Sequence, residues 1–237
     1  MGEPAIRGIL FDKDGTLFDF AATWVPAYMA AADALAKAVG QPDLAARCLA
    51  ASGYDDERGI FVPGSPLACA GNDEIIALWL DEAGIDSLPG GTGFVLDVLF
   101  EHAARAVHPV TDLGLLFRRL RERGLELGVA TADSTLAAQA ALAAIGVGSE
   151  VDFIAGYDAD CGAKPSPAVV HAFCRHVGLV AGEVAVVGDS VVDAEMARAA
   201  GAGLAIGVLT GPTPRKLLEP AVDRLVASIA DLESILG

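Results

Sequence analysis

The chain has 237 residues, of which 53% are hydrophobic, and a formal net charge of -16 from 16 Lys and Arg against 32 Asp and Glu. This length favours one domain with a sizeable insert, because domains most often have about 100–150 residues. The hydrophobic fraction supports a large core and excludes disorder along most of the chain. The acidic surface argues against nucleic-acid and membrane partners, since both are polyanions.

Neither the N-terminus nor the cysteines indicate export or a zinc site. Residues 1–8 are charged and lack the apolar core of a signal peptide, and no uncharged stretch offers the roughly 20 apolar residues of a membrane span. The cysteines form no CxxC pair and have no His at zinc-ligand spacing: Cys48, Cys69, Cys161 and Cys174. We therefore expect a cytoplasmic protein with reduced thiols.

Apolar periodicity and turn residues predict the elements in chain order. A short buried strand is predicted over 8–11. Mostly helical residues follow, with a loop at 59–71 and helices at 21–39, 43–51, 72–83 (capped by Asn72 or Asp73) and from the break at 89–93 to about 107. Strands are then predicted at 125–130, 151–155, 184–187 and 204–208, and helices at 112–123, 134–145, 165–177, 191–200 and 229–236.

This order of elements predicts an α/β fold. Strands that alternate with helices imply a doubly wound parallel sheet with helices on both faces. About 90 mostly helical residues separate the first strand from the others. We therefore expect one domain made of 1–19 and 109–237, with an α-helical domain, 20–108, inserted after the first strand.

Two carboxylates, Asp12 and Asp14, come directly after the first predicted strand. One of them could act as a nucleophile or metal ligand and the other as a general acid and base. Gly15 would permit a tight turn and a close approach of the backbone to a ligand. A polar turn with a helix-capping Asp explains the same residues, so both interpretations remain open.

Two further segments offer groups for an anion. Thr131 ends the strand at 125–130 just before a helix, where its hydroxyl, free N–H groups and the helix dipole suit a phosphate oxygen. An ordinary N-cap at Thr131 or Ser134 is the alternative. Lys164 lies in a Gly- and Pro-bounded loop at a helix start, where the dipole disfavours a cation. It therefore needs an anionic partner, unless it is simply solvated.

The last segment adds two more carboxylates. Asp189 follows the strand at 184–187, and Asp193 lies one helical turn later on the same side. Because ligands bind at the carboxyl ends of parallel strands, these groups should meet Asp12 and Asp14 there and repel them. A hard divalent cation such as Mg²⁺ would relieve this repulsion.

In their order, spacing and strand-end context, the four segments resemble the motifs of the haloacid dehalogenase superfamily of phosphohydrolases. The matching residues are Asp12-Lys13-Asp14-Gly15-Thr16-Leu17 for the DxDGT motif, Thr131, Lys164-Pro165, and Gly188-Asp189 with Asp193 for the GDxxxD motif. The resemblance spans essentially the whole chain. The insert is similar to the α-helical C1-type cap, and the overall pattern is similar to phosphoglycolate-phosphatase-like members.

The resemblance implies an Mg²⁺-dependent phosphatase that acts on a small-molecule phosphate monoester. Asp12 would attack phosphorus and form an aspartyl-phosphate. Asp14 would protonate the leaving alkoxide and then activate water. Thr131 and Lys164 would hold the phosphoryl oxygens and neutralise charge in the transition state.

The resemblance also implies the residues around these groups. The phosphate would contact the backbone at Gly15 and Ala132. The metal ligands would be the Asp12 carboxylate, the Asp14 backbone carbonyl and Asp189. Asp193 would support the metal shell or orient Lys164.

The insert carries weaker candidates for substrate specificity. Where many family members have V-D-S, this chain has Phe18-Asp19-Phe20. Phe20 and Trp24 share one predicted helical face, either as an apolar wall at the substrate entrance or as ordinary packing. Arg47 and Arg58 could meet a substrate carboxylate or sugar oxygen, or could be solvated.

Two alternative functions remain open. A phosphosugar mutase of the same superfamily would pass the phosphoryl group to a hydroxyl, and a non-enzymatic protein could keep the fold. The cation-poor insert, with Lys37, Arg47, Arg58 and Arg105, argues against the mutase. The full set of motif residues argues against a non-enzymatic protein. We expect a monomer or a homodimer.

Overall fold

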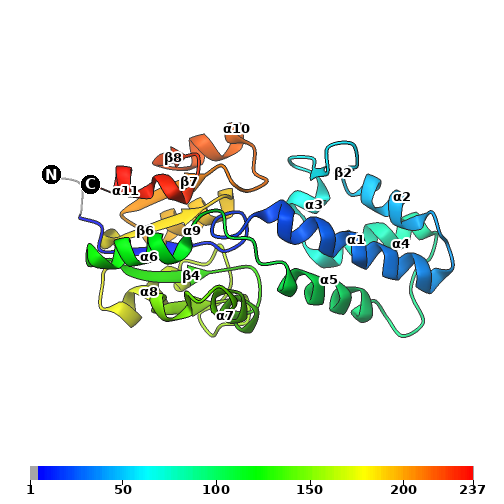
Figure 1. Ribbon diagram of the computed structural model, residues 1–237, viewed down its shortest axis with the longest axis horizontal. Helices are drawn as coiled ribbons and strands as arrows, with labels where there is room; N and C mark the ends of the chain where they lie inside the picture. The colour runs from blue at the N-terminus through cyan, green and yellow to red at the C-terminus, as the bar shows by residue number, and fades with distance from the viewer. Residues whose placement is uncertain (1–4, 237) are drawn as a thin grey trace. The chain divides into compact units, whose positions relative to one another are not determined.

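The structure, a computed structural model, describes residues 5–236 and divides into two compact units (Figure 1). The core unit comprises Met1–Asp19 and His108–Gly237, and the helical unit comprises Phe20–Val107. The start of the charged N-terminal segment, residues 1–4, lies outside the described residues. No helix among residues 5–236 is long and apolar enough to cross a membrane.

A six-stranded, fully parallel sheet forms the centre of the core unit, with the strand order β5-β4-β1-β6-β7-β8. Its strands are β1 (Gly8–Phe11), β4 (Glu126–Ala130), β5 (Phe153–Ala155), β6 (Val184–Gly188), β7 (Leu204–Val208) and β8 (Arg224–Val226). The predicted parallel α/β fold is confirmed. Strand β8 was not predicted, because it has only three residues and begins with an exposed Arg224.

Helices cover both faces of this sheet. They are α6 (Leu113–Glu122), α7 (Thr135–Ala144), α8 (Ala168–Val177), α9 (Val191–Ala200), α10 (Arg215–Leu218) and α11 (Leu232–Ile235), with 3-10 turns at Gly148–Glu150, Ala181–Glu183, Glu219–Ala221 and Ile229–Asp231. Leu10 packs in one cluster with Phe173 of α8 and Met196 of α9. Phe11 instead stacks on Phe117 of α6, at 5.6 Å between ring centroids. Successive strand residues point to opposite faces, so these contacts mark the two layers.

The register of the three central strands fixes where the site lies. Phe11, the last residue of β1, pairs with Val129 of β4 and with Val187 of β6. The three strands therefore end at nearly the same level. The strand order runs outward from β1 in both directions, to β4 and β5 on one side and to β6, β7 and β8 on the other. The carboxyl end of β1 is therefore the topological switch point, where open α/β sheets bind ligands.

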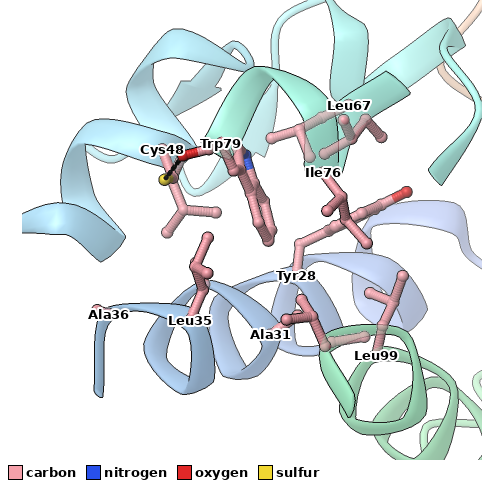
Figure 2. Close-up of a cluster of buried hydrophobic side chains, with 14 of the residues drawn as sticks. Tyr28, Ala31, Leu35, Ala36, Cys48, Leu67, Ile76, Trp79 and Leu99 are labelled. Atoms are coloured by element: carbon pink, nitrogen blue, oxygen red, sulfur yellow. Dashed lines mark hydrogen bonds between the residues drawn. The ribbon is translucent and has the colours of Figure 1, made fainter. Parts of the chain in front are cut away.

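The helical unit has its own hydrophobic core. It contains α1 (Phe20–Val39), α2 (Leu44–Ala51), α3 (Pro66–Cys69), α4 (Asn72–Ala83), α5 (Gly93–Arg105) and a small hairpin of β2 (Tyr54–Asp55) and β3 (Ile60–Phe61). The Ala-rich α1 is a strong helix former. Figure 2 shows Tyr28 and Leu35 of α1 directed toward Trp79 and Ile76 of α4. The Trp79 side chain is 1% exposed and stands edge-on to Tyr28.

The predicted loop at 59–71 is partly wrong, since β3 and α3 lie within it. A strand of two residues is too short to show an alternating pattern in the sequence. The packing of Phe61 of β3 against Phe20 and Tyr28 explains why the strand forms. The predicted cap of α4 is also wrong. Gly71 holds the N-cap position, and Asn72 instead accepts a hydrogen bond from the Tyr28 hydroxyl at 2.6 Å.

Two helix predictions in the core unit need correction. The helix expected at 165–177 begins at Ala168, after Pro165 and Pro167, because a chain with two closely spaced prolines leaves the helical region between them. The helix expected at 229–236 is a 3-10 turn followed by the four-residue α11, and the short α10 was not predicted. Elements of three or four residues are too short to show periodicity.

A buried chain of hydrogen bonds joins α2 to α4 in the helical unit. The Trp79 indole N–H donates to the Ser52 hydroxyl at 2.6 Å, and this hydroxyl donates to the Cys48 carbonyl at 2.6 Å. The Cys48 thiol donates to the Trp79 carbonyl at 3.8 Å, the dashed line in Figure 2. Burial raises the pKa of Cys48 to about 12, so its thiol stays protonated.

We expect Ser52→Ala to lower the free energy of unfolding of the helical unit by about 1–3 kcal/mol, because it leaves the Trp79 N–H buried without an acceptor. Both tryptophans of the chain lie in this unit, so urea titration followed by tryptophan fluorescence reports its unfolding. Ser65→Ala is the matched control, because the buried Ser65 hydroxyl has no hydrogen-bond partner among the described residues. Equal losses in the two variants would contradict the expectation.

Candidate active site

The turn after β1 is closed by its own backbone. The amides of Leu17 and Phe18 donate to the Lys13 carbonyl at 2.9 and 3.0 Å, and the Gly15 amide donates to the Phe18 carbonyl at 2.7 Å. Gly15 has a φ of 86°, and a Cβ there would overlap the Asp189 carboxylate. Only glycine suits this position. The Gly15 N–H already has an acceptor, so the phosphate contact expected of it is not available from this amide.

Lys164 joins two carboxylates from different strand ends. Its Nζ lies 2.5 Å from Asp12 Oδ1 and 2.7 Å from Asp193 Oδ1, and all three side chains are at most 10% exposed. Burial alone would lower the pKa of Lys164, but the two carboxylates raise it above its ordinary value. The ammonium group is therefore charged, with the anionic partners that its position requires.

Asp193 also fixes the start of α9. Its Oδ2 accepts from the Ser190 hydroxyl at 2.5 Å and from the Ser190 amide at 3.3 Å, while the Asp193 amide donates back to the hydroxyl. This is a capping box, which satisfies the first amides of the helix. One oxygen of Asp193 thus anchors the helix while the other holds Lys164. Asp193 contacts Lys164 and also lies beside Asp12 and Asp189, so both roles expected of it stay predictions.

Asp12 and Asp193 also form a group of three carboxylates with Asp189. One oxygen of each of these residues lies within 4.8 Å of the others. Asp12 Oδ2 is buried and has no hydrogen-bond partner among the described residues. Burial raises the pKa of Asp12 to about 6, although Lys164 opposes the shift, and burial followed by repulsion from Asp12 raises the pKa of Asp189 well above its ordinary value. Oxygen donors held this way fit a hard cation such as Mg²⁺.

Thr131 directly follows β4, the strand that pairs with β1, and Asp12 directly follows β1. The N-cap of α7 is Ser134, whose hydroxyl accepts from the Ala137 amide at 3.2 Å, so Thr131 is not the cap. The buried Thr131 hydroxyl accepts from the Asp133 amide at 3.0 Å. No acceptor for its hydrogen occurs within residues 5–236. Ala132, next in the chain, is exposed.

Residues that the sequence analysis did not select also border the site. Thr210 Oγ1 donates to the Gly15 carbonyl at 2.6 Å, and a Cβ on Gly211 would overlap Asp189. Both follow β7, so examining every strand end would have found them. Lys13 Nζ contacts Asp14. The position of Lys13 between Asp12 and Asp14 in the sequence could have indicated that it lies at the site.

The specificity candidates of the helical unit have partners within that unit. Phe20 and Trp24 lie 6.4 Å apart between ring centroids, in the same aromatic cluster as Phe61. The Arg47 guanidinium donates to the Glu82 carbonyl at 3.1 Å and to Gln41 at 2.8 Å. The Arg58 side chain is exposed, in the turn between β2 and β3. Packing and surface roles therefore account for the observed contacts of these residues.

We expect Asp189→Asn to raise the Tm of the metal-free protein at pH 7.5. Asp189 ionises in the unfolded chain at the ordinary Asp pKa, whereas its folded pKa is raised, so above the ordinary value the carboxylate costs folding free energy. A gain of about 1 kcal/mol corresponds to about 2–4 °C in a chain of this size. The difference should vanish as the pH falls below the ordinary Asp pKa, and thermal unfolding in EDTA measures it.

With Mg²⁺ we expect the wild-type protein to have the higher Tm and Asp189→Asn the lower. Saturating Mg²⁺ should stabilise the wild-type protein, by about 2.7 kcal/mol at 100 times its Kd, and should leave the Tm of Asp189→Asn nearly unchanged. Asp43→Asn serves as the control, since Asp43 is exposed and its side chain makes no capping bond. Equal stabilisation of wild type and Asp189→Asn by Mg²⁺ would contradict this assignment of the ligands.

Comparison with known proteins places this geometry in a family. A family model described as haloacid dehalogenase-like hydrolase matches residues 6–201. The chain is 28% identical to a phosphoglycolate phosphatase of Pectobacterium atrosepticum, over 98% of this chain and 93% of the relative. It is 30% identical to the probable phosphatase IndB of Dickeya dadantii, over 86% of this chain and 81% of the relative.

A solved structure shares the fold. The crystal structure of a predicted phosphoglycolate phosphatase from Haemophilus somnus superposes with a TM-score of 0.75 at 18% identity, over 100% of both chains. The expected type of enzyme, a hydrolase similar to phosphoglycolate phosphatases, is confirmed by these matches. The chain belongs to the haloacid dehalogenase-like hydrolase family.

Proposed function

We propose that this hydrolase is an Mg²⁺-dependent phosphatase that cleaves a small-molecule phosphate monoester through an aspartyl-phosphate on Asp12. The observation that carries the proposal is the environment of Asp12. One of its oxygens is paired with Lys164, and the other is buried without a hydrogen-bond partner. The similarity to relatives named as phosphatases supports the same reaction.

The reaction proceeds in two balanced steps. A carboxylate oxygen of Asp12 forms a bond to phosphorus while the ester P–O bond breaks, and Asp14 gives its proton to the departing alkoxide. Water then attacks the phosphorus, and Asp14 takes a proton from it. The Asp12–phosphorus bond breaks, which releases inorganic phosphate and restores Asp12 as a carboxylate and Asp14 as an acid.

The neighbouring residues supply charge and orientation. Lys164 places a fixed positive charge beside Asp12, and the Thr131 hydroxyl hydrogen is available to a phosphoryl oxygen. Asp12, Asp189 and the Asp14 backbone carbonyl would hold Mg²⁺, which when bound supplies the positive charge that offsets the carboxylates and the phosphoryl group. Asp193 keeps Lys164 in place. Ala132, exposed in the turn between β4 and α7, remains the candidate backbone contact for the phosphate.

We assign the chemistry to the core unit, 1–19 and 108–237, and the choice of leaving group to the helical unit, 20–107, acting as a cap. Phosphoglycolate is the first ester to test, because a relative over nearly the whole chain is named for it. Phe20, Trp24, Arg47 and Arg58 remain the cap residues to vary. The four cations of the cap give a mutase few groups for a bisphosphate.

We also propose a compartment, an oligomeric state and a class of partner for the enzyme. We place it in the cytoplasm as a monomer or homodimer that binds a small phosphate ester and no nucleic acid. The net charge of -16 disfavours polyanionic partners. Cys48, Cys161 and Cys174 are free thiols, as a reducing compartment requires.

A phosphate-release screen tests the reaction. Sugar phosphates, phosphoglycolate, nucleotides and amino-acid phosphates are incubated with Mg²⁺ or with EDTA. We expect Mg²⁺-dependent release that Asp14→Asn slows by roughly 10²–10⁴-fold and that Asp12→Asn lowers at least as far. Asp43→Asn should keep wild-type rates. Undiminished release by Asp12→Asn would refute the mechanism, and interconversion of a sugar phosphate without release would favour the mutase.

The covalent intermediate has its own test. Borohydride reduces an acyl phosphate to an alcohol, so treatment during turnover should convert Asp12 to homoserine, detected as a mass change in the peptide that contains it. Asp12→Asn provides the blank. Reduction at another aspartate would show that this other residue, and not Asp12, is the nucleophile.

A further inference from the structure

Lys13 is a buried cation that the proposed reaction leaves without a role. Its side chain is 6% exposed, and its Nζ lies 2.7 Å from each of the two carboxylate oxygens of Asp14. The same ammonium group lies 3.3 Å from Asp133 Oδ2, and the Phe18 ring covers it at 5.9 Å from the ring centroid. A cation so enclosed is held by these partners and not by water.

The second partner, Asp133, is itself fixed to the start of α7. Its Oδ1 accepts from the Ser134 amide at 2.7 Å, and its own amide donates to Thr131 Oγ1 at 3.0 Å. Ser134 is the N-cap of this helix. Asp133 therefore connects Lys13 to a rigid helix and to the hydroxyl at the end of β4.

The contact between Lys13 and both oxygens of Asp14 has a geometric consequence. A single contact would leave the carboxylate free to rotate, whereas two contacts of equal length fix the direction of its plane. Asp14 is 15% exposed and lies two residues from the like-charged Asp12, so without a partner it would turn toward water. Proton transfer requires a defined orientation, because catalytic groups lose rate when they are misplaced by even 1 Å.

We propose that Lys13 and Asp133 are positioning residues that hold the Asp14 carboxyl group in the orientation for proton transfer. The inference rests on the proposed function, in which Asp14 is the acid and the base. Asp133 anchors Lys13 from the turn between β4 and α7, and Lys13 anchors Asp14 on the turn after β1. The chain of contacts thus joins the two segments on either side of the phosphate.

The test uses the dependence of the rate on the leaving group. A poor leaving group, the alkoxide of 2-phosphoglycolate, needs a proton from Asp14, whereas the phenolate of 4-nitrophenyl phosphate departs with little help. The parameter kcat/KM reports phosphoryl transfer to Asp12. Loss of orientation should therefore lower kcat/KM for the alkyl ester much more than for the aryl ester, while general damage to the fold should lower both equally.

Three variants and one control are compared in the full-length protein with Mg²⁺. Asp14→Asn defines the pattern for loss of the acid. We expect Asp133→Asn and Lys13→Met to lower kcat/KM for 2-phosphoglycolate by about 10–100-fold and for 4-nitrophenyl phosphate by less than about 3-fold. Asp158→Asn is the matched control, because Asp158 accepts from Thr135 at the same helix start and does not contact Lys13. It should leave the ratio of the two esters unchanged.

A double variant completes the test. If Asp133 acts only through Asp14, adding Asp133→Asn to Asp14→Asn should not change the ratio further. Equal losses for both esters in Asp133→Asn, or additive effects in the double variant, would overturn the positioning role even if Asp14→Asn shows the expected pattern. If Asp14→Asn does not discriminate between the esters, or the wild type releases phosphate from no ester of the screen, the proposed function fails and the inference fails with it.

Discussion

Mutual repulsion of buried carboxylates is the constraint on which the core unit depends. Five carboxylates, Asp12, Asp14, Asp133, Asp189 and Asp193, surround two ammonium groups, which leaves a charge of -3 when all are ionised. Lys164 and Lys13 divide this set into two clusters, each with one ammonium between two carboxylates. Asp189 belongs to neither cluster. Burial first, and then repulsion between the carboxylates, raises the pKa values of Asp12 and Asp189. A divalent cation would offset two of these three charges.

The sheet topology makes this arrangement geometrically accessible. The central β1 pairs with β4 and β6 in register, so residues that are more than 100 positions apart in the sequence meet at one edge. Close packing and hydrogen bonds then hold the turns at this edge together. Gly15 and Gly211 both lie where a side chain would strike Asp189, and Thr210 ties the first turn to the end of β7. A site of this density tolerates little displacement, as catalytic geometry requires.

The sequence predicted the parts of the protein that depend on local pattern. The apolar runs of β1, β4 and β6 were sufficient to predict the central strands, and the polar residues directly after them led to the proposed site residues Asp12, Thr131 and Asp189. Elements of two to four residues, such as β3 and α10, escaped because their stability comes from partners far away in the chain. Lys13 and Asp133 were missed for the same reason, since their contact joins positions 120 residues apart that only the strand pairing brings together.

The two units divide stability and chemistry between them. The helical unit buries an aromatic and aliphatic core, with a closed chain of hydrogen bonds around Trp79. The described carboxylate clusters with buried cations lie instead in the core unit, where neutralising a single carboxylate such as Asp189 relieves a cost to folding. Function and stability are therefore opposed at the edge of the sheet, as in other sites that hold charge for catalysis. The apolar core described for the helical unit contains no such cluster of buried carboxylates, so this cost to folding falls on the core unit alone.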